Sequence, residues 1–279
     1  MQPSTTGVDR YAVIGNPVSH SKSPQIHAAF AAATGQSLEY TAILAPLDEF
    51  PQTVTAFRQQ GGRGLNITLP FKQAAAELCD QLSERGRRAG AVNTISFNNN
   101  ELYGENTDGV GLLQDLQGNL ECEIVGRAVL ILGAGGAARG IIDPLFDAQP
   151  GQVCIANRSL DKAHLIADAF KDRGHIKVSG YPALAGQAFD IVINATSLSL
   201  GNELPPLPAG VFKPGALAYD MMYANQSTCF MDWAMQAGAS RTADGLGMLV
   251  EQAAEAFYLW RGVRPETPPV QALIRQQLG

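Results

Sequence analysis

The chain has 279 residues, of which 46% are hydrophobic and 16% charged, a composition typical of a folded globular protein. Its length allows two domains with separate cores. The formal net charge of -6 provides no basic surface, so we expect neither nucleic acid nor a membrane as a partner.

Membrane insertion, export and metal binding are not expected either. No apolar run approaches the roughly eighteen residues that cross a bilayer, and the N-terminus lacks the apolar core of a signal peptide. The cysteines form no CxxC pair and the histidines have no metal-ligand spacing. We therefore expect a cytoplasmic protein with buried thiols and no metal. The sequence leaves open whether it is a monomer or a homodimer.

From residue 11 to residue 104, short apolar runs alternate with helical patterns, which is typical of an α/β unit. The expected elements are strand Tyr11–Gly15, helix Pro24–Ala33, strand Leu38–Leu44, helix Leu47–Gln60, strand Gly64–Leu69, and a hairpin of Ala91–Phe97 and Leu102–Glu105 around Asn98-Asn99-Asn100. A helix beginning near Asp108 leads out of this region.

A second α/β run follows. Its expected strands are Arg127–Leu132, Val153–Ala156, Phe189–Asn194 and Ala216–Asp220, and its last helix is Met248–Trp260. The predicted fold class is therefore α/β with two domains.

A glycine-rich turn links the first strand of this run to a helix. The segment Gly133-Ala134-Gly135-Gly136-Ala137-Ala138 matches the pattern G-x-G-x-x-A in the strand–turn–helix context that the pattern requires. Gly133 permits the tight turn, Gly135 lets the backbone approach a pyrophosphate, and Ala138 allows close helix packing. The sequence predicts dinucleotide binding here; the alternative is a purely structural turn.

The end of the next strand favours NADP over NAD. An NAD site usually has an acidic residue about twenty residues after the turn, to bind the ribose 2′-hydroxyl. This chain has Asn157-Arg158-Ser159, with Lys162 one turn later. A guanidinium pairs with a 2′-phosphate, which a carboxylate would repel. An ordinary solvated strand end is the alternative, and nearby Asp161 weakens the preference.

Two serines precede the first expected helix. We predict Ser23 at its N-cap and Pro24 at N1. Because Ile26 occupies N3, no capping box forms, and free amides remain beside two hydroxyls. This arrangement suits a carboxylate ligand. The alternative is that Ser23 only caps the helix, so the functional prediction depends mainly on Ser21.

The strand ending at Leu69 is expected to place Asn66 and Thr68 on the face opposite its apolar residues. Since buried parallel strands are usually apolar on both faces, this predicts a wet cleft. Lys72 follows the carboxyl end of that strand, where open α/β sheets bind ligands. A solvated lysine is the alternative for Lys72, and a simple N-cap is the alternative for Asp108.

A series of motifs along essentially the whole chain resembles shikimate dehydrogenases, and their combination and order are specific to that family. The motifs are Gly15–Pro24, Asn66–Lys72, Gly90–Thr94, Asn106–Gly109, Gly133–Ala137, Asn157–Ser159, Asn194–Ser197 and Asp244–Met248.

The resemblance implies reversible reduction of 3-dehydroshikimate to shikimate with NADPH, a step toward chorismate and the aromatic amino acids. It implies that Lys72 and Asp108 form the catalytic pair. The implied substrate ligands are Ser21 and Ser23 for the carboxylate, Thr68, Asn93, Asp108 and Gln252 for the ring hydroxyls, and Tyr223 near the substrate. The implied NADP ligands are Gly133, Ala134, Gly135, Gly136, Ala137, Asn157, Arg158, Ser159, Lys162, Met221 and Gly245.

The resemblance also implies a division of the chain into a substrate domain over residues 1–107, a Rossmann-type NADP domain over residues 108–244, and C-terminal helices over residues 245–279 that return to the first domain. Three segments depart from the family pattern. Lys162 replaces a frequent arginine, Leu198-Ser199-Leu200 replaces a usual Ser-Gly, and Cys229 follows Thr228 where proline is usual.

Two roles for Lys72 remain open. Its ammonium can donate a proton to the developing alkoxide, or it can stabilise that charge without transfer. An adjacent Asp108 carboxylate favours the charged lysine. Two other functions are also open: a quinate dehydrogenase of the same fold that uses NAD or both cofactors, and a catalytically silent NADP-binding module.

Overall fold

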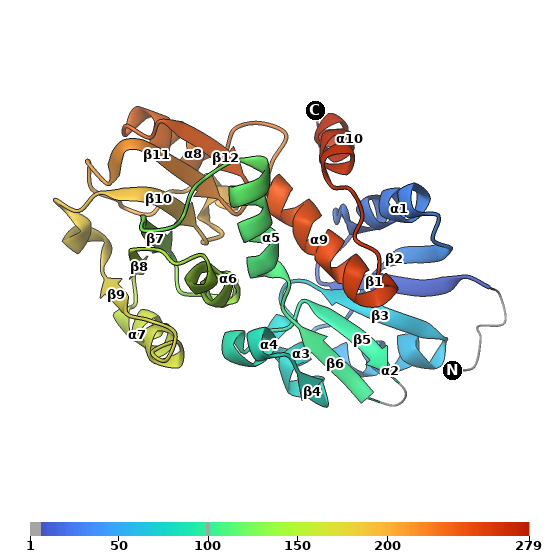
Figure 1. The fold of residues 1–279 in the computed structure, drawn as a ribbon. Helices are drawn as coiled ribbons and strands as arrows, with labels where there is room; N and C mark the ends of the chain where they lie inside the picture. The colour runs from blue at the N-terminus through green and yellow to red at the C-terminus, as the bar shows by residue number, and fades with distance from the viewer. Residues whose placement is uncertain (1–6, 99–100, 279) are drawn as a thin grey trace. The chain divides into compact units, whose positions relative to one another are not determined.

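The structure is a computed structural model and describes residues 7–98 and 101–278. The chain divides into two compact units, Met1–Gly111 with Val250–Gln276, and Leu112–Leu249 with Gln277–Gly279. Each unit contains a six-stranded sheet, which confirms the predicted α/β class (Figure 1). The expected turn at Asn98-Asn99-Asn100 lies outside the described residues except for Asn98.

The first unit has a mixed sheet with strand order β2-β1-β3-β5-β6-β4. Parallel pairing joins β1 to β2 and β3, and antiparallel pairing joins β5 to β3 and β6. The strands are β1 Asp9–Gly15, β2 Leu38–Leu44, β3 Gly62–Ile67, β4 Gln81–Leu82, β5 Thr94–Asn98 and β6 Glu101–Glu105. The helices are α1 Ser23–Thr34, α2 Phe50–Gln59, α3 Lys72–Leu78, α4 Glu84–Ala89 and α10 Pro268–Leu278.

Side chains of β1 point alternately into two apolar layers. Ala12 and Ile14 pack in one cluster with Phe50 of α2. Tyr11, on the other face, packs with Trp260, and the two ring centroids are 4.6 Å apart. Because both faces of the central strands are covered, ligands have access to this sheet at its strand ends.

The second unit has an entirely parallel sheet with strand order β12-β11-β10-β7-β8-β9. This is the strand order of a dinucleotide-binding domain, in which the order reverses between the neighbouring strands β7 and β10. The strands are β7 Ala128–Leu132, β8 Gln152–Ala156, β9 Ile176–Ser179, β10 Phe189–Asn194, β11 Phe212–Asp220 and β12 Arg241–Asp244. The helices are α6 Gly136–Asp147, α7 Leu160–Ala169 and α8 Cys229–Gln236, with a π-helical turn at Asp115–Asn119 and 3-10 turns at Tyr181–Leu184 and Leu198–Gly201.

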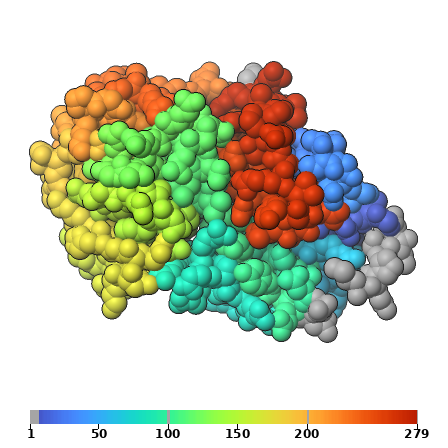
Figure 2. All heavy atoms as spheres, in the orientation of Figure 1, coloured from blue at the N-terminus to red at the C-terminus, as the bar shows by residue number. Residues whose placement is uncertain are grey.

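Two helices cross the boundary between the units in sequence. They are α5 Asp108–Gln114 and α9 Leu246–Arg261. The part of α9 in the first unit buries Ala253, Ala256 and Phe257. Its opposite side, with Tyr258 47% exposed, lies on the surface of that unit beside α10 (red in Figure 2). The buried stripe fixes the rotation of α9, and therefore where its polar residues point.

Candidate functional site

Lys72 and Asp108 lie side by side in the first unit. Lys72 is the first residue of α3 and Asp108 the first residue of α5. Lys72 Nζ donates a hydrogen bond to Asp108 Oδ2 at 2.5 Å. The two side chains are 23% and 9% exposed. This is a partly dehydrated ion pair in which the ammonium retains contact with solvent.

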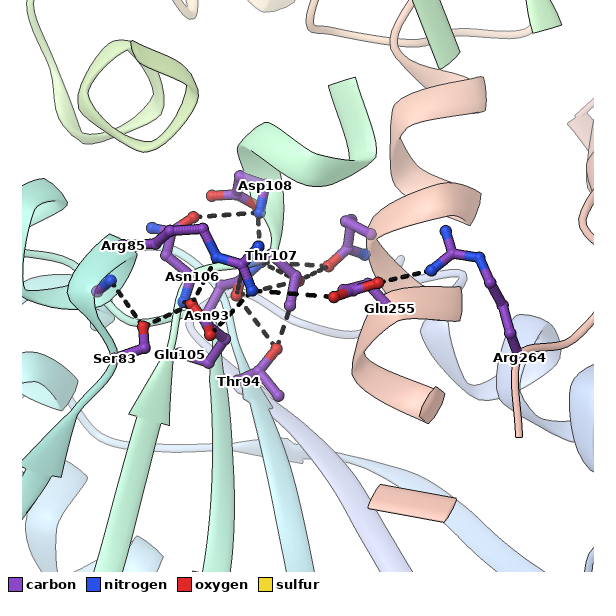
Figure 3. Close-up of polar contacts among 12 residues, drawn as sticks. Ser83, Arg85, Asn93, Thr94, Glu105, Asn106, Thr107, Asp108, Glu255 and Arg264 are labelled. Carbon is purple, nitrogen blue, oxygen red and sulfur yellow. Dashed lines mark hydrogen bonds and ion pairs between the residues drawn. The ribbon is translucent and has the colours of Figure 1, made fainter. Parts of the chain in front are cut away.

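Asn93 connects this pair to two other polar side chains. Its Nδ2 donates to Asp108 Oδ1 at 2.8 Å, to Thr107 Oγ1 at 3.0 Å and to Gln252 Oε1 at 3.2 Å (Figure 3). Its Oδ1 accepts a hydrogen bond from Thr107 N at 2.8 Å. Gln252 lies on α9, so this hydrogen bond joins two residues that are 159 positions apart in the sequence. Both oxygens of Asp108 are thus occupied by donors, which fixes the plane of its carboxylate.

The prediction that Ser23 caps α1 is wrong. The helix begins at Ser23, and the N-cap is Lys22, which makes no side-chain capping bond. Ser21 Oγ instead accepts a hydrogen bond from Ser23 N at 3.3 Å and donates to Ser23 Oγ at 3.2 Å. The two hydroxyls therefore meet at the N-terminus of a 12-residue helix that has no acidic residue in its first turn.

The wet cleft predicted around Asn66 is also wrong. Asn66 is 6% exposed, accepts a hydrogen bond from Tyr40 Oη at 2.7 Å, and donates to Thr94 Oγ1 at 3.1 Å. Its amide is buried and satisfied within the unit. β3 ends at Ile67, so Thr68 lies beyond the strand, half-buried, while Leu69 is 65% exposed.

The sequence did not point to Arg85 and Glu105, which lie next to this site. Glu105 is 5% exposed and accepts two hydrogen bonds from the guanidinium of Arg85. Arg85 stands in the short charged segment Glu84–Arg88, a pattern typical of a solvated helix, so local sequence gives no signal for it. Glu105 directly precedes the motif Asn106-Thr107-Asp108, and this adjacency was the only available clue.

In the second unit, the glycine-rich segment has the form that phosphate binding requires. Gly133 has a φ of +101°, and a Cβ there would lie 3.0 Å from Thr196 Cγ2. Gly135 is the N-cap of α6, which has no acidic residue in its first turn. A Cβ at Gly135 or Gly136 would meet no atom within 4 Å. Ala134 and Ala137 are half-buried, and the open amides beside them suit a pyrophosphate.

The residues expected at the 2′-phosphate gather where β8 ends. Asn157 Nδ2 donates to Ser159 O at 2.8 Å, which shapes the turn into α7. Arg158, Ser159 and Lys162 are exposed. Ser159 is the N-cap of α7 and makes no side-chain capping bond. This donor set fits an anionic group, although Asp161 in the first turn of α7 opposes it.

Met221 and Gly245 pack against each other at the ends of β11 and β12. A Cβ on Gly245 would collide with the Met221 carbonyl, so this position requires glycine. Met221 is 9% exposed. Tyr223, half-buried, follows two residues later, and burial, with a contribution from the Asp244 carboxylate, raises its pKa.

Two of the three segments that depart from the family pattern meet at a buried carboxylate, and the third, at Lys162, does not. Asp220 Oδ2 accepts hydrogen bonds from Ser199 Oγ and Thr228 Oγ1, each at 2.7 Å. Asp220 Oδ1 accepts one from Asn194 Nδ2 at 3.1 Å. Burial raises the pKa of Asp220, and these hydrogen bonds oppose the rise. Ser199 and Thr228 therefore tie two loops to the end of β11.

The cysteines are free, and only Cys122 and Cys154 are fully buried, so the prediction that all are buried thiols is wrong for Cys79 and Cys229. Burial raises the pKa of Cys79 to about 12 and that of Cys154 to about 11, which keeps both as thiols. Among the described residues, no helix has the length and apolarity to cross a membrane, and no His, Cys, Asp and Glu side chains group to hold a metal ion.

A parallel sheet with a dinucleotide turn, in a chain whose other unit carries a Lys–Asp pair, defines the class of nicotinamide-dependent oxidoreductases. Comparison with known proteins narrows this class. The family models that match are the shikimate dehydrogenase substrate binding domain over residues 13–95, shikimate / quinate 5-dehydrogenase over residues 116–200, and the shikimate 5'-dehydrogenase C-terminal domain over residues 245–275.

Individual relatives agree with these models. Shikimate dehydrogenase (NADP(+)) of Nitrosospira multiformis is 55% identical, over 97% of this chain and 98% of its own. Among solved structures, an Ael1 enzyme from Pseudomonas putida has a TM-score of 0.91 and 50% identity, covering 97% of this chain and 98% of its own. Shikimate 5-dehydrogenase from Thermus thermophilus, in complex with NADP(H) and shikimate, has a TM-score of 0.86 and 33% identity, covering 97% and 100%. The chain belongs to the shikimate dehydrogenase family, as its motifs predicted.

Proposed function

We propose that this chain catalyses the reversible reduction of 3-dehydroshikimate to shikimate with NADPH, in the cytoplasm. The observation that carries the proposal is the 2.5 Å contact between Lys72 Nζ and Asp108 Oδ2, in a member of the shikimate dehydrogenase family. An ammonium held by a carboxylate is a proton donor of fixed position, which ketone reduction requires.

We assign substrate binding mainly to polar side chains of the first unit. Ser21 and Ser23 receive the carboxylate, because their hydroxyls meet at a helix N-terminus. The ring hydroxyls bind to Thr68 and to the amide groups of Asn93 and Gln252. We assign Tyr223 to the substrate as well. We assign substrate binding to residues 1–107, with helices 245–279, and cofactor binding to residues 108–244.

The cofactor assignment depends on the second unit. The turn from Gly133 to Ala137 holds the pyrophosphate, and Asn157, Arg158, Ser159 and Lys162 hold the ribose and its 2′-phosphate. Met221 and Gly245 lie along the nicotinamide. NADPH, when bound, supplies the hydride that the ketone carbon accepts. The glycines that leave open space at the α6 N-terminus and the exposed Arg158 support this assignment.

Lys72 supplies the proton in the reductive direction. Its ammonium transfers a proton to the oxygen that becomes the alcohol, while Asp108 keeps the nitrogen in place. In the reverse direction a neutral amine must accept that proton, so shikimate oxidation is expected to accelerate as pH rises. The alternative is electrostatic: the ammonium stabilises the alkoxide and solvent supplies the proton.

The test is Lys72→Met, with Lys213→Met as the matched control. Lys213 also forms a Lys–Asp pair, with Asp190 at 2.8 Å, but at the surface of the second unit. We expect Lys72→Met to lower kcat by on the order of 10²- to 10⁴-fold with little change in KM, and Lys213→Met to leave it unchanged. A wild-type kcat in Lys72→Met would reject both roles of the lysine.

A substrate panel separates the remaining functions. Shikimate and quinate are each offered with NADP and with NAD, and nicotinamide absorbance is followed. The proposal expects shikimate with NADP to be turned over fastest. Faster turnover of quinate, or of NAD, would assign the chain to the quinate dehydrogenases instead, and binding of NADP without any turnover would indicate a silent module.

A further inference from the structure

A chain of partly buried polar contacts runs from α4 through the loop before Asp108 to α9 (Figure 3). We propose that Arg85 and Glu105 are positioning residues for the reaction. Together they hold the catalytic carboxylate of Asp108 and the ring-binding amide of Gln252 in fixed positions relative to each other. This inference deepens the proposed function and rests on it.

Glu105 is the centre of the chain. Its Oε1 accepts hydrogen bonds from Ser83 Oγ at 2.6 Å, Asn106 N at 2.7 Å and Arg85 Nε at 3.2 Å, and its Oε2 accepts one from Arg85 Nη2 at 3.0 Å. A carboxylate that is 5% exposed requires such partners, because an unpaired buried charge is strongly unfavourable. Arg85 is the only cation among these donors, and it holds both oxygens of Glu105.

The loop transmits this position to Asp108. Glu105 fixes the backbone of Asn106, and Asn106 Oδ1 accepts a hydrogen bond from Asp108 N at 3.1 Å. Asn106 Nδ2 donates to Ala91 O at 3.0 Å, which anchors the loop beside Asn93. Glu105 therefore supports the backbone of Asp108 through one intervening residue, Asn106, and so helps to set its separation from Lys72.

The same guanidinium faces α9. Arg85 Nη2 lies 3.8 Å from Glu255 Oε1, and Glu255 Oε2 accepts a hydrogen bond from Arg264 Nη1 at 2.6 Å. Glu255 lies three residues after Gln252, on the same side of the helix. Gln252 Oε1 accepts from Asn93 Nδ2 at 3.2 Å and from Thr107 Oγ1 at 3.4 Å. Arg85 thus joins the loop that carries Asp108 to the helix that carries Gln252.

The geometry makes arginine specific at this position. Its fork bonds both oxygens of Glu105 while one of its nitrogens faces Glu255. A lysine has a single nitrogen and cannot maintain these contacts together. Arg85→Lys should therefore lose part of the positioning effect, and Arg85→Met should lose all of it. Glu105→Gln keeps an acceptor for Asn106 N but removes the charge.

The test compares Arg85→Met, Arg85→Lys and Glu105→Gln with Arg87→Met. Arg87 lies on the same helix and pairs at 2.7 Å with Glu84, where both side chains are more than half exposed. Steady-state kinetics with shikimate and NADP give kcat and both KM values, and kcat is measured against pH. Thermal melting follows folding.

We expect Arg85→Met to lower kcat about 10- to 100-fold. Displacement of a reacting group by about 1 Å can lower the rate by up to about 100-fold. KM for shikimate rises and KM for NADP stays within twofold. The pH profile of shikimate oxidation should differ from that of the wild type, because Lys72 Nζ and Asp108 Oδ2 no longer keep their 2.5 Å separation. Arg85→Lys and Glu105→Gln should show smaller changes of the same kind.

A merely structural ion pair would lower the melting temperature and leave kcat and the pH profile as they are in Arg87→Met, and that result overturns the inference. If Arg85→Met does not fold, the two milder variants decide by the same criteria. Failure of the wild-type protein to turn over shikimate is a different result, which refutes the proposed function and the positioning role with it.

Discussion

His27 should make the first unit sensitive to acid. The imidazole is 1% exposed and stacks on Tyr40 with ring centroids 4.2 Å apart. Neither ring nitrogen has a hydrogen-bond partner within the described chain. Burial therefore lowers the pKa of His27 from 6.5 to about 3. The native state holds this histidine neutral.

The sign of the effect follows from proton uptake. Below pH 6.5 the unfolded chain binds a proton at His27, whereas the native state does so only near pH 3. Stability from this residue is complete above pH 6.5 and is lost as pH falls toward 3. From these two pKa values, the free energy of unfolding should fall by about 2 kcal/mol between pH 7 and pH 5.

The assay is urea unfolding followed by fluorescence, in a Trp233→Phe background. Trp260, whose ring lies 5.5 Å from His27, then reports on the first unit alone. Between pH 7 and pH 5 we expect the free energy of unfolding to fall by about 2 kcal/mol less in His27→Phe than in the wild type. His20→Gln, at an exposed position, should show the same fall as the wild type. The same pH dependence in wild type and His27→Phe would show that this imidazole is not held neutral.

Two predictions concern the second unit. Arg158→Ala should raise KM for NADP about 10- to 100-fold, because a charge-assisted pair contributes roughly 1.5–3 kcal/mol. KM for NAD should change little, and equal changes in the two KM values would remove Arg158 from the phosphate site. Thr228→Val should lower the free energy of unfolding by about 1–3 kcal/mol in urea titrations, because the Thr228 hydroxyl both caps α8 and bonds Asp220. Thr228→Ser should retain both bonds. Equal losses in the two Thr228 variants would contradict this assignment.

The elements that sequence predicted best are those whose pattern is local. β10 occupies the expected residues 189–194, because all of its residues except Asp190 are buried and polar segments flank it. The glycine turn follows β7 as predicted, since the strand–turn–helix order is written in consecutive residues. β9 and β12 were not predicted: each is a four-residue strand at a sheet edge, too short to show a pattern of its own.

The sequence by itself determined the α/β class, the dinucleotide turn, the family and the candidate residues Lys72 and Asp108, because each depends on short motifs. Only the tertiary structure decided what surrounds them. It buried Asn66 against Tyr40, where alternation had suggested a wet face, and it placed Arg85 against Glu105, where local charge had suggested solvent. Burial and partner choice depend on which distant segments cover a residue, and no local pattern of side chains carries that information.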